Sequence, residues 1–373
     1  MRQLYNFKKI IFVFSLLTMV SHWSFSQKYS NEFLSIGLGA RAQAMGGAFV
    51  ATVDDVTAGF WNPAALASID MRNGIQIGAQ HAEWFAGIGK YDYLGFAMPF
   101  DNHKRALGVT AIRFGIDDIP NTLSLYNDDG SVNYDNVKPF SAADYAFLFS
   151  YAQKVHTDRG KLFLGGNVKV VHRSIGPFAK SWGFGLDASL QFHTEKWKWG
   201  LMLKDITNTF NAWTFDFTDQ EKVVLELTNN DIPIKSLEVT RPQITFAGAR
   251  EFDFGKIGLT TELDMTMFMD GKRNTLISSF PFSFDPTLGL EANYGKFVFL
   301  RAGINNVQED SDLGGKKFWT VQPNLGVGLK MYKFRLDYAF TDIGDSSNQT
   351  YSHVVSMVLD LNFNYFKKVA ARK

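Results

Sequence analysis

The sequence contains no cysteine. This absence excludes disulfides, thiolate metal sites, a cysteine nucleophile and a lipid-modified cysteine. The formal net charge is +1, so overall electrostatics give no support to nucleic-acid binding. Beyond residue 26 no stretch approaches about 18 consecutive apolar residues, which excludes a transmembrane helix there. Aromatic residues and glycine are frequent instead, a composition that is compatible with an all-β protein.

Motifs that carry catalysis or metal binding are also missing. The histidines are scattered without a His-Glu-x-x-His run, and no Gly-x-Ser-x-Gly sequence occurs. Gly37 and Gly39 lack the third glycine and the preceding strand of a dinucleotide site, so we interpret them as structural. The acidic stretch 127–130 lacks the later glutamate of an EF-hand loop, which favours a solvated turn over a calcium site. We therefore expect no enzyme, no cofactor and no metal.

The first 26 residues have the pattern of a secretory signal peptide. Basic residues precede an apolar run over 10–20, and the small residues Ser24 and Ser26 mark a cleavage site before Gln27. The run is too short to cross about 30 Å of hydrocarbon as a helix, which favours a signal peptide over a transmembrane anchor. We expect the mature chain to begin near Gln27 and to leave the cytoplasm.

Most of the remaining chain repeats one pattern, in which apolar and polar side chains alternate. Near the C-terminus Val355, Met357 and Leu359 share one face, while Ser356 and Asp360 lie on the other. Each run has about ten residues, the length that a tilted strand needs to cross a membrane. We predict about fourteen such strands, at 74–80, 90–99, 105–114, 144–154, 162–173, 182–194, 197–205, 242–252, 257–267, 286–294, 297–305, 321–331, 333–341 and 352–366.

The connections between these runs differ in length. Long connections at 116–143, 206–241, 268–285 and 306–320 alternate with short turns. Transmembrane β-barrels have short turns on one side and long loops on the other, whereas a soluble β-sandwich has no reason to place its long loops at one end. We therefore predict an all-β fold, an antiparallel transmembrane β-barrel of about fourteen strands, in preference to a soluble β-fold.

Charged residues of both signs lie in the strands on the polar face. An Arg or Lys that faced lipid at the membrane midplane would cost about 2–4 kcal/mol, so we expect these side chains to face a lumen. Our first interpretation is a wet interior in which they pair, and a proton relay or substrate site is the alternative. The candidate lumen charges are Lys169, Asp187, Glu262, Asp264, Glu291, Arg301, Lys330, Arg335, Asp337 and Asp360.

The third run departs from strict alternation. Leu107 and Val109 share one face, but Ile112 and Phe114 fall on the other. A β-bulge near Ala111 would produce this shift. The alternative, which we favour, is that the two apolar side chains pack against an inserted segment.

Residues 33–67 have neither the alternation of a strand nor the polarity of a disordered tail. Their apolar side chains need burial, so we predict that they fold into the barrel lumen as a plug, with a periplasmic cap as the alternative. Dense glycines allow close approach and positive φ, and Asn-Pro favours a turn. For Arg41 we expect an acidic partner among Asp187, Glu262, Glu291 and Asp360. The candidate plug residues are Gly39, Arg41, Met45, Gly46, Gly47, Asp54, Asp55, Trp61, Asn62 and Pro63.

The same segment carries a family resemblance. It contains the runs Gly39-Ala40-Arg41-Ala42, Met45-Gly46-Gly47-Ala48, Asp54-Asp55-Val56-Thr57 and Trp61-Asn62-Pro63-Ala64. Together these resemble the N-terminal signature of the PorV/PorQ family of Bacteroidetes outer-membrane proteins. That family is related to the FadL-type fatty-acid transporters, which carry a similar Asn-Pro-Ala element. The resemblance implies a fourteen-stranded barrel in the cell outer membrane, with the N-terminal segment as a hatch in its lumen.

Two non-enzymatic functions follow from this resemblance, and both stay open at this point. The first is an accessory, scaffold or cargo-binding component of type IX protein secretion, associated with gliding, whose partners are outer-membrane lipid, a translocon protein and secreted cargo. The second is a FadL-like channel that takes up hydrophobic small molecules, which an apolar pocket between hatch and wall would favour. The expected division is a signal peptide over 1–26, a plug or hatch over 27–70 and a barrel over 71–373.

Overall fold

The structure is a computed structural model, and it describes residues 30–70, 74–84, 87–127, 129–232, 235–312, 314–342 and 351–362. The predicted signal peptide, residues 1–26, lies outside the described residues. In the described part of the chain, no helix has both the length and the apolar character needed to cross a membrane.

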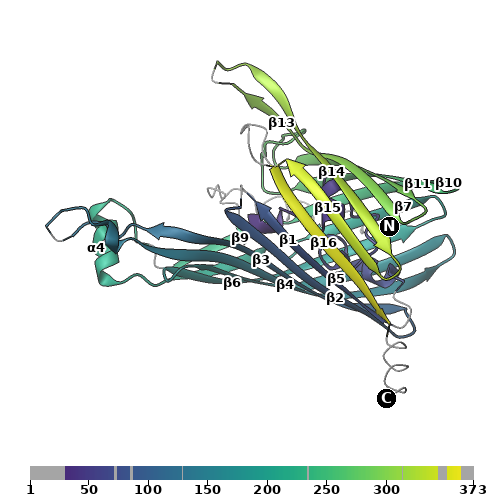
Figure 1. Ribbon diagram of the computed structural model, residues 1–373, viewed down its shortest axis with the longest axis horizontal. Coiled ribbons are helices and arrows are strands. Elements are labelled where there is room, and N and C mark those ends of the chain that lie inside the picture. Colours follow the sequence, from purple (N-terminus) through teal and green to yellow (C-terminus); the bar gives the residue numbers. More distant parts are fainter. Residues whose placement is uncertain are drawn as a thin grey trace, which may run out of the picture.

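The fold is an antiparallel β-barrel (Figure 1). Its sheet has sixteen strands, and fourteen of them form a ring that closes where the first strand pairs with the last, from Gly74 opposite Asn362 to Glu83 opposite His353. The ring strands are β1 (Gly74–Trp84), β2 (Gly89–Phe100), β3 (Arg105–Asn121), β4 (Lys138–Thr157), β5 (Gly160–Ile175), β6 (Ala179–His193), β7 (Trp197–Lys204), β10 (Gln243–Phe254), β11 (Ile257–Phe268), β12 (Ser283–Tyr294), β13 (Val298–Ser311), β14 (Lys317–Met331), β15 (Phe334–Asp342) and β16 (Tyr351–Asn362).

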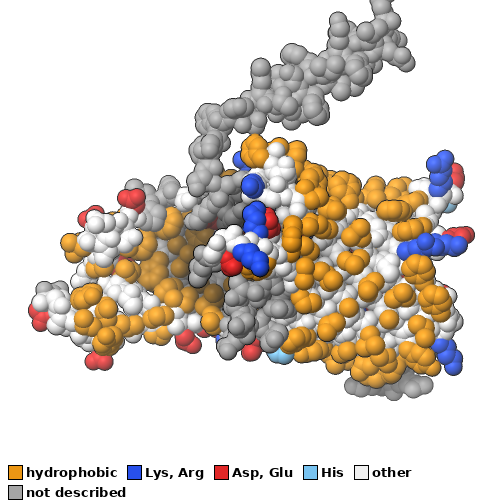
Figure 2. Space-filling view, turned by 90° about the horizontal axis from the view of Figure 1, so that it is seen from above, with side chains coloured by type: hydrophobic (Ala, Val, Ile, Leu, Met, Phe, Trp, Pro, Cys, Tyr) orange, Lys and Arg blue, Asp and Glu red, His pale blue; other side chains and the backbone are white. Residues whose placement is uncertain are grey.

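The fourteen-stranded barrel confirms the sequence prediction, and each predicted run falls on one ring strand, except that residues 363–366 of the last run lie outside the described residues. The two faces of the strands differ as the alternation requires. On β14 the side chain of Val327 is 48% exposed on the outside, whereas Asn324 is only 2% exposed on the inside. Figure 2 shows hydrophobic side chains over most of the outer wall on the face that it draws, with few charged side chains among them.

The long connection 206–241 contains structure that the sequence analysis missed. It holds β8 (Thr209–Phe215), helix α4 (Asp219–Leu227) and β9 (Lys235–Thr240). Strand β7 pairs with one half of β6, and β8 then pairs with the other half, so β8 extends the wall where β7 stops. These elements escaped prediction because they are short, with at most nine residues each. Helix α4 lies at the far tip of this extension (Figure 1).

Strand β3 contains no bulge near Ala111. Its pairing with β2 is regular from Arg105 to Ile116, and the irregularity in its pairing with β4 comes later, between Ile116 and Ile119. Ile112 is 2% exposed and belongs to the interior core, and Phe114 packs against that core. The preferred alternative is therefore right, because apolar residues replace polar ones on the inner face where they meet an inserted segment.

Residues 30–70, which we call the lumenal segment, pack against the inner face of the ring. They form the short helices η1 (Glu32–Leu34), α2 (Ala40–Ala44), α3 (Ala58–Trp61) and η2 (Pro63–Ser68). The remaining short helix, η3 (Tyr134–Asn136), lies in the connection between β3 and β4. The main hydrophobic core combines buried side chains of the lumenal segment with those of the inner wall. In Figure 1 the segment, drawn in purple, lies among the ring strands.

Candidate functional site

The lumenal segment is bound to the wall largely through its backbone. Because the segment has little regular secondary structure, many of its N–H and C=O groups need partners from elsewhere. Wall side chains supply them, as where Asn167 donates to the carbonyl of Gly59 at 2.9 Å and Ser189 accepts from the N–H of Ala64 at 2.9 Å. Further wall side chains that bond to the segment's backbone are Gln76, Gln80, Gln191, Glu262, Asp264 and Ser356.

Glycines on the inner wall make room for this close contact. A Cβ added at Gly200 would lie 2.7 Å from the carbonyl oxygen of Val50, and one at Gly303 would overlap the backbone of Met45. No side chain fits where two backbones approach so closely. At Gly165 and Gly289 backbone atoms of the segment are also among the nearest neighbours, whereas at Gly78, Gly108 and Gly326 the nearest segment atoms belong to side chains. Sequence analysis missed this set, although glycines that recur on the polar face of predicted strands are a readable signal.

The glycines of the segment itself shape its path. Gly39 precedes α2 with φ 82°, and Gly46 and Gly47 follow the helix with φ 66° and 83°. This left-handed region favours glycine and ends the helix, where the N–H of Gly47 donates to the carbonyl of Ala42 at 2.9 Å. Met45, between these glycines and the wall, is fully buried.

Trp61 is the last residue of α3, Asn62 follows it, and Pro63 begins η2. The indole of Trp61 donates to the carbonyl of Leu38 at 2.7 Å and therefore links α3 to the stretch that precedes α2. The amide of Asn62 is fully buried and donates to the carbonyls of Val50 and of Leu190 on β6, at 2.8 and 3.1 Å. Pro63 occupies the first position of η2, where its missing N–H costs nothing.

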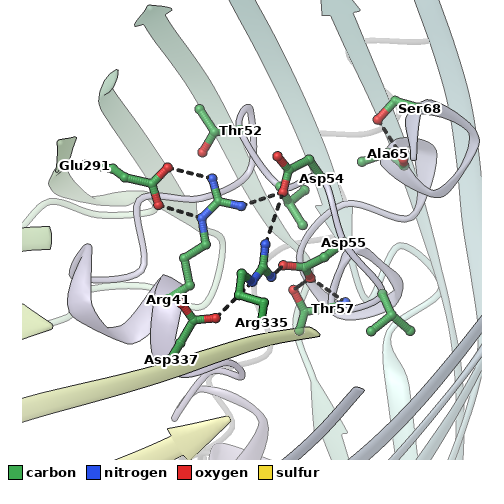
Figure 3. Close-up of polar contacts among 12 residues, drawn as sticks. Arg41, Thr52, Asp54, Asp55, Thr57, Ala65, Ser68, Glu291, Arg335 and Asp337 are labelled. Atoms are coloured by element: carbon green, nitrogen blue, oxygen red, sulfur yellow. Dashed lines mark hydrogen bonds and ion pairs between the residues drawn. The ribbon is translucent and has the colours of Figure 1, made fainter. Parts of the chain in front are cut away.

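Arg41 connects the lumenal segment to β12. Its guanidinium donates twice to Glu291, from Nε at 2.7 Å and from Nη2 at 2.9 Å, a bidentate geometry that strengthens the pair. Its Nη1 also contacts Asp54 (Figure 3). Glu291 is one of the four acids expected as a partner for Arg41, and Asp54 of the segment itself was not expected in this role.

The contacts of Arg41 extend into a larger ion network. Arg301 donates to Glu291 at 2.6 Å and to Asp337 at 2.8 Å. Arg335 donates to Asp337 at 2.9 Å, contacts Asp55 and lies 3.8 Å from Asp54 (Figure 3). We call this set the Arg41 network; it has three arginines and four acids, a formal charge of −1, and consists of Arg41, Asp54, Asp55, Glu291, Arg301, Arg335 and Asp337.

Asp54 is the most exposed member of the network, with 53% of its side-chain surface open. The surrounding protein raises its pKa, but the attraction of Arg41 and then of Arg335 outweighs that effect, so the net result is a pKa below the ordinary value. Asp54 is therefore ionised at neutral pH and holds the lumenal segment against the wall by charge.

Two further clusters hold other buried charges. On one side of the lumen, Lys169 lies 3.1 Å from Asp187 and 2.5 Å from Asp205. On the other side, Asp264 accepts the N–H groups of Phe49 and Val50 at 3.0 and 3.1 Å. Its neighbour Glu262 accepts the N–H of Ala51 at 2.6 Å and also bonds to the hydroxyl of Thr52. These acids therefore bind the loop of the segment that follows Gly47.

Lys330 and Asp360 lie apart from these clusters, near the short turn between β14 and β15. Together with Asp54 they line a small cavity of about 50 Å³. Asp360 also accepts a hydrogen bond from Gln76 at 2.7 Å. Lys330 is exposed. The structure thus distributes the ten predicted lumen charges over several groups around the segment rather than in one catalytic cluster.

A larger cavity of about 350 Å³ lies on the opposite side of the lumenal segment, toward the long connections. Gly46, Gly47, Val50 and Trp61 line it from the segment. Its wall residues include several that sequence analysis did not single out, namely Lys204, Asp205, Gln243, Arg273, Asp285 and Asn305. Within the described ranges, no group of three or more His, Cys, Asp or Glu could hold a metal ion.

No protein-family model and no curated protein matches the sequence. Solved structures do match. The CymD monoaromatic hydrocarbon channel aligns over 90% of this chain and 99% of its own, with a TM-score of 0.54 and 14% identity. The Ralstonia pickettii toluene transporter TbuX aligns over 87% and 99%, with a TM-score of 0.51 and 14% identity. A Pseudomonas aeruginosa FadL homologue aligns over 86% and 98%, with a TM-score of 0.51 and 13% identity.

The chain has the FadL-type barrel fold. The expected relation to FadL-type proteins is confirmed at the level of architecture. At 12–14% identity the matching channels carry over the fold alone, so the PorV/PorQ resemblance of the N-terminal signature stays an interpretation of the sequence.

Proposed function

We propose that this protein is an outer-membrane channel of FadL-like architecture, through which a small molecule passes from the long-loop end of the barrel toward the short-turn end. The observation that carries the proposal is the cavity of about 350 Å³ that residues of the wall and of the lumenal segment line together. Its size suits a small molecule. The proposal involves passage and binding, and no chemical reaction.

The apolar outer face of the wall supports the proposal that the barrel lies in a membrane. Large apolar side chains project outward along successive strands, as with Leu300, Leu325 and Leu336, which are all exposed. In water this apolar surface would be costly, whereas lipid would cover it. The secretory signal pattern at the N-terminus supports the outer membrane as the location.

The lumenal segment is the barrier in this proposal. Val50 lines the larger cavity and Asp54 the small one, so the stretch 50–54 of the segment borders both spaces. This stretch is held by hydrogen bonds to Glu262 and Asp264 and by the ion pairs of Asp54. Passage requires these contacts to break while the backbone hydrogen bonds of the wall stay intact.

Removal of residues 30–68 tests the proposal. The wall strands keep all their mutual hydrogen bonds, so we expect the shortened chain to assemble as a heat-modifiable barrel in the outer-membrane fraction. Because the barrier is missing, liposomes that contain it should admit small solutes much faster than liposomes that contain the full chain. An assembled barrel that remains impermeable would refute the channel, and a mature full chain found in the soluble periplasm would refute the location.

A second candidate is an accessory role in type IX protein secretion. The N-terminal signature resembling PorV/PorQ supports it, and so do apolar side chains on the long connections that are available to a protein partner, with Tyr134 78% and Phe280 81% exposed. The partners would be a translocon protein or secreted cargo. Deletion of the gene followed by a comparison of secreted proteins tests this role, since unchanged secretion would exclude it.

A further inference from the structure

The larger cavity has the wrong lining for a hydrocarbon. Besides polar and apolar groups it contains eight ionisable side chains, namely Glu32, Lys169, Asp187, Lys204, Asp205, Asp264, Arg273 and Asp285. A hydrocarbon would displace water from such groups without replacing its hydrogen bonds, which is unfavourable. We infer that the solute held in this cavity is a small organic cation, an inference that rests on the proposed channel function.

The balance of charge around the cavity favours a cation. Five of the eight ionisable lining residues are acids and three are bases, so the lining has a formal charge of −2. The two signs are not distributed evenly. Lys169 and Lys204 lie close to Asp187 and Asp205, and this side of the cavity is balanced. On the other side Arg273 is the only base among the lining residues, and the acids of the lining there are Glu32, Asp264 and Asp285.

Arg273 is already engaged by other acids. It donates from Nε to both carboxylate oxygens of Asp270, at 2.9 and 2.8 Å, and lies 3.7 Å from Glu32. Asp285 attracts it only at longer range, and among the described residues no hydrogen bond or ion pair is found for the Asp285 carboxylate, whose Oδ1 is buried. A buried carboxylate oxygen without a hydrogen-bond partner is costly, so a cationic solute beside Asp285 would relieve that cost.

Aromatic rings in the same cavity suit the same class of solute. Phe60, Trp61 and Phe268 all line it. The protein's own cations already lie over these rings, with the Lys204 Nζ 4.3 Å from the centre of Phe60 and the Arg273 guanidinium 4.2 Å from that of Phe268. Ring faces attract cations through their quadrupole, most strongly where water is excluded. A solute that combines a positive charge with apolar carbon would suit this lining, which already holds cations against aromatic rings, and would pair with the Asp285 carboxylate.

Three probes of similar size and different charge test the inference: benzylammonium, toluene and benzoate. Each carries one benzene ring, so their binding differs mainly through charge. Binding to the purified full chain in detergent is measured by titration calorimetry. We expect benzylammonium to bind more tightly than toluene, and benzoate to bind most weakly. Asp285→Asn should weaken benzylammonium binding about tenfold and leave toluene unchanged, because it removes a charge-assisted contact.

Asp231→Asn is the matched control, because it removes an exposed carboxylate from a long connection outside the cavity lining. It should leave all three affinities unchanged. If Asp285→Asn fails to assemble, Phe268→Leu replaces it and should weaken benzylammonium binding about threefold.

Equal binding of toluene and benzylammonium, or no binding of benzylammonium, would overturn the inference. Neither result would contradict the proposed channel function. That function is tested separately by the permeability of the barrel that lacks residues 30–68.

Discussion

The barrel wall and the lumenal segment satisfy their polar groups in opposite ways. In the wall, backbone groups bond to the neighbouring strand, and side chains are free to alternate between apolar outside and polar inside. In the lumenal segment, backbone groups bond to particular wall side chains such as Asn167 and Asp264. A wall residue therefore needs only the right polarity for its face, whereas a segment residue needs the right atom in the right place.

Glycine has a different use in the two regions. In the segment Gly39, Gly46 and Gly47 supply backbone angles with positive φ. On the inner wall, glycines such as Gly200 and Gly303 supply space, because segment atoms occupy the position that a side chain would take. The wall is therefore shaped to the segment, and the two regions are complementary surfaces of one interior.

The largest effect is expected when a charged side chain is placed on the apolar outer face of the wall. Val327→Arg places a cation among the exposed apolar residues Leu325 and Leu329, and it should cost about 2–4 kcal/mol of barrel stability if lipid covers them. Gln322→Arg, on the same strand but lining the cavity, should cost much less. Heat-modifiable gel migration reports the assembled fraction. Equal losses for both variants would mean that the two faces of β14 are not distinguished by lipid.

A substitution at an inner-wall glycine tests the packing of the lumenal segment separately from the assembly of the wall. Gly303→Ala inserts a methyl group where Met45 and Gly46 lie, and such overpacking typically costs about 1–3 kcal/mol. We expect the barrel still to form, but the lumenal segment to become accessible to protease and the barrel to leak in liposomes. In the control Gly248→Ala the new methyl group meets only the exposed side chain of Trp199, which can move away. If the Gly303→Ala barrel does not leak in liposomes, the lumenal segment tolerates substitutions as freely as the wall does.

The smallest effect is expected from Asp54→Asn. The lowered pKa of Asp54 means that its stabilising charge is fully present above the unfolded-state pKa of about 3.9 and is lost as the pH falls through the lower folded-state pKa. The variant lacks this contribution at every pH. Protease protection of the lumenal segment, measured from pH 7 to pH 3, should therefore be slightly lower at pH 7 and should fall less steeply with acid.

The effect of Asp54→Asn is small because water reaches about half of this side chain, with 53% exposed, and screens its ion pairs. Asp312→Asn, an exposed carboxylate on the connection between β13 and β14, is the control and should match the parent chain at all pH values. An identical acid profile for parent and Asp54→Asn would show that the Arg41 network holds the segment without this residue.

The sequence by itself determined the wall. Residues such as Val355, Met357 and Leu359 repeat every second position, and this period is that of a strand whose two faces meet different surroundings. Because each wall strand pairs only with its neighbours in the ring, local alternation contains nearly all the information needed. The short elements β8, α4 and β9 were the exception, since few residues carry their pattern.

Only the tertiary structure decided the interior. That Arg41 pairs with Glu291, 250 positions away, depends on how the ring closes and how deep the segment lies, and no periodicity records either. Sequence limited the partner to a set of acids, but the choice among them required three-dimensional proximity. The cavity beside Asp285 is likewise a product of distant strand ends that converge over the segment. Contacts between residues far apart in the chain are set by the packing of the whole barrel, and local sequence does not encode them.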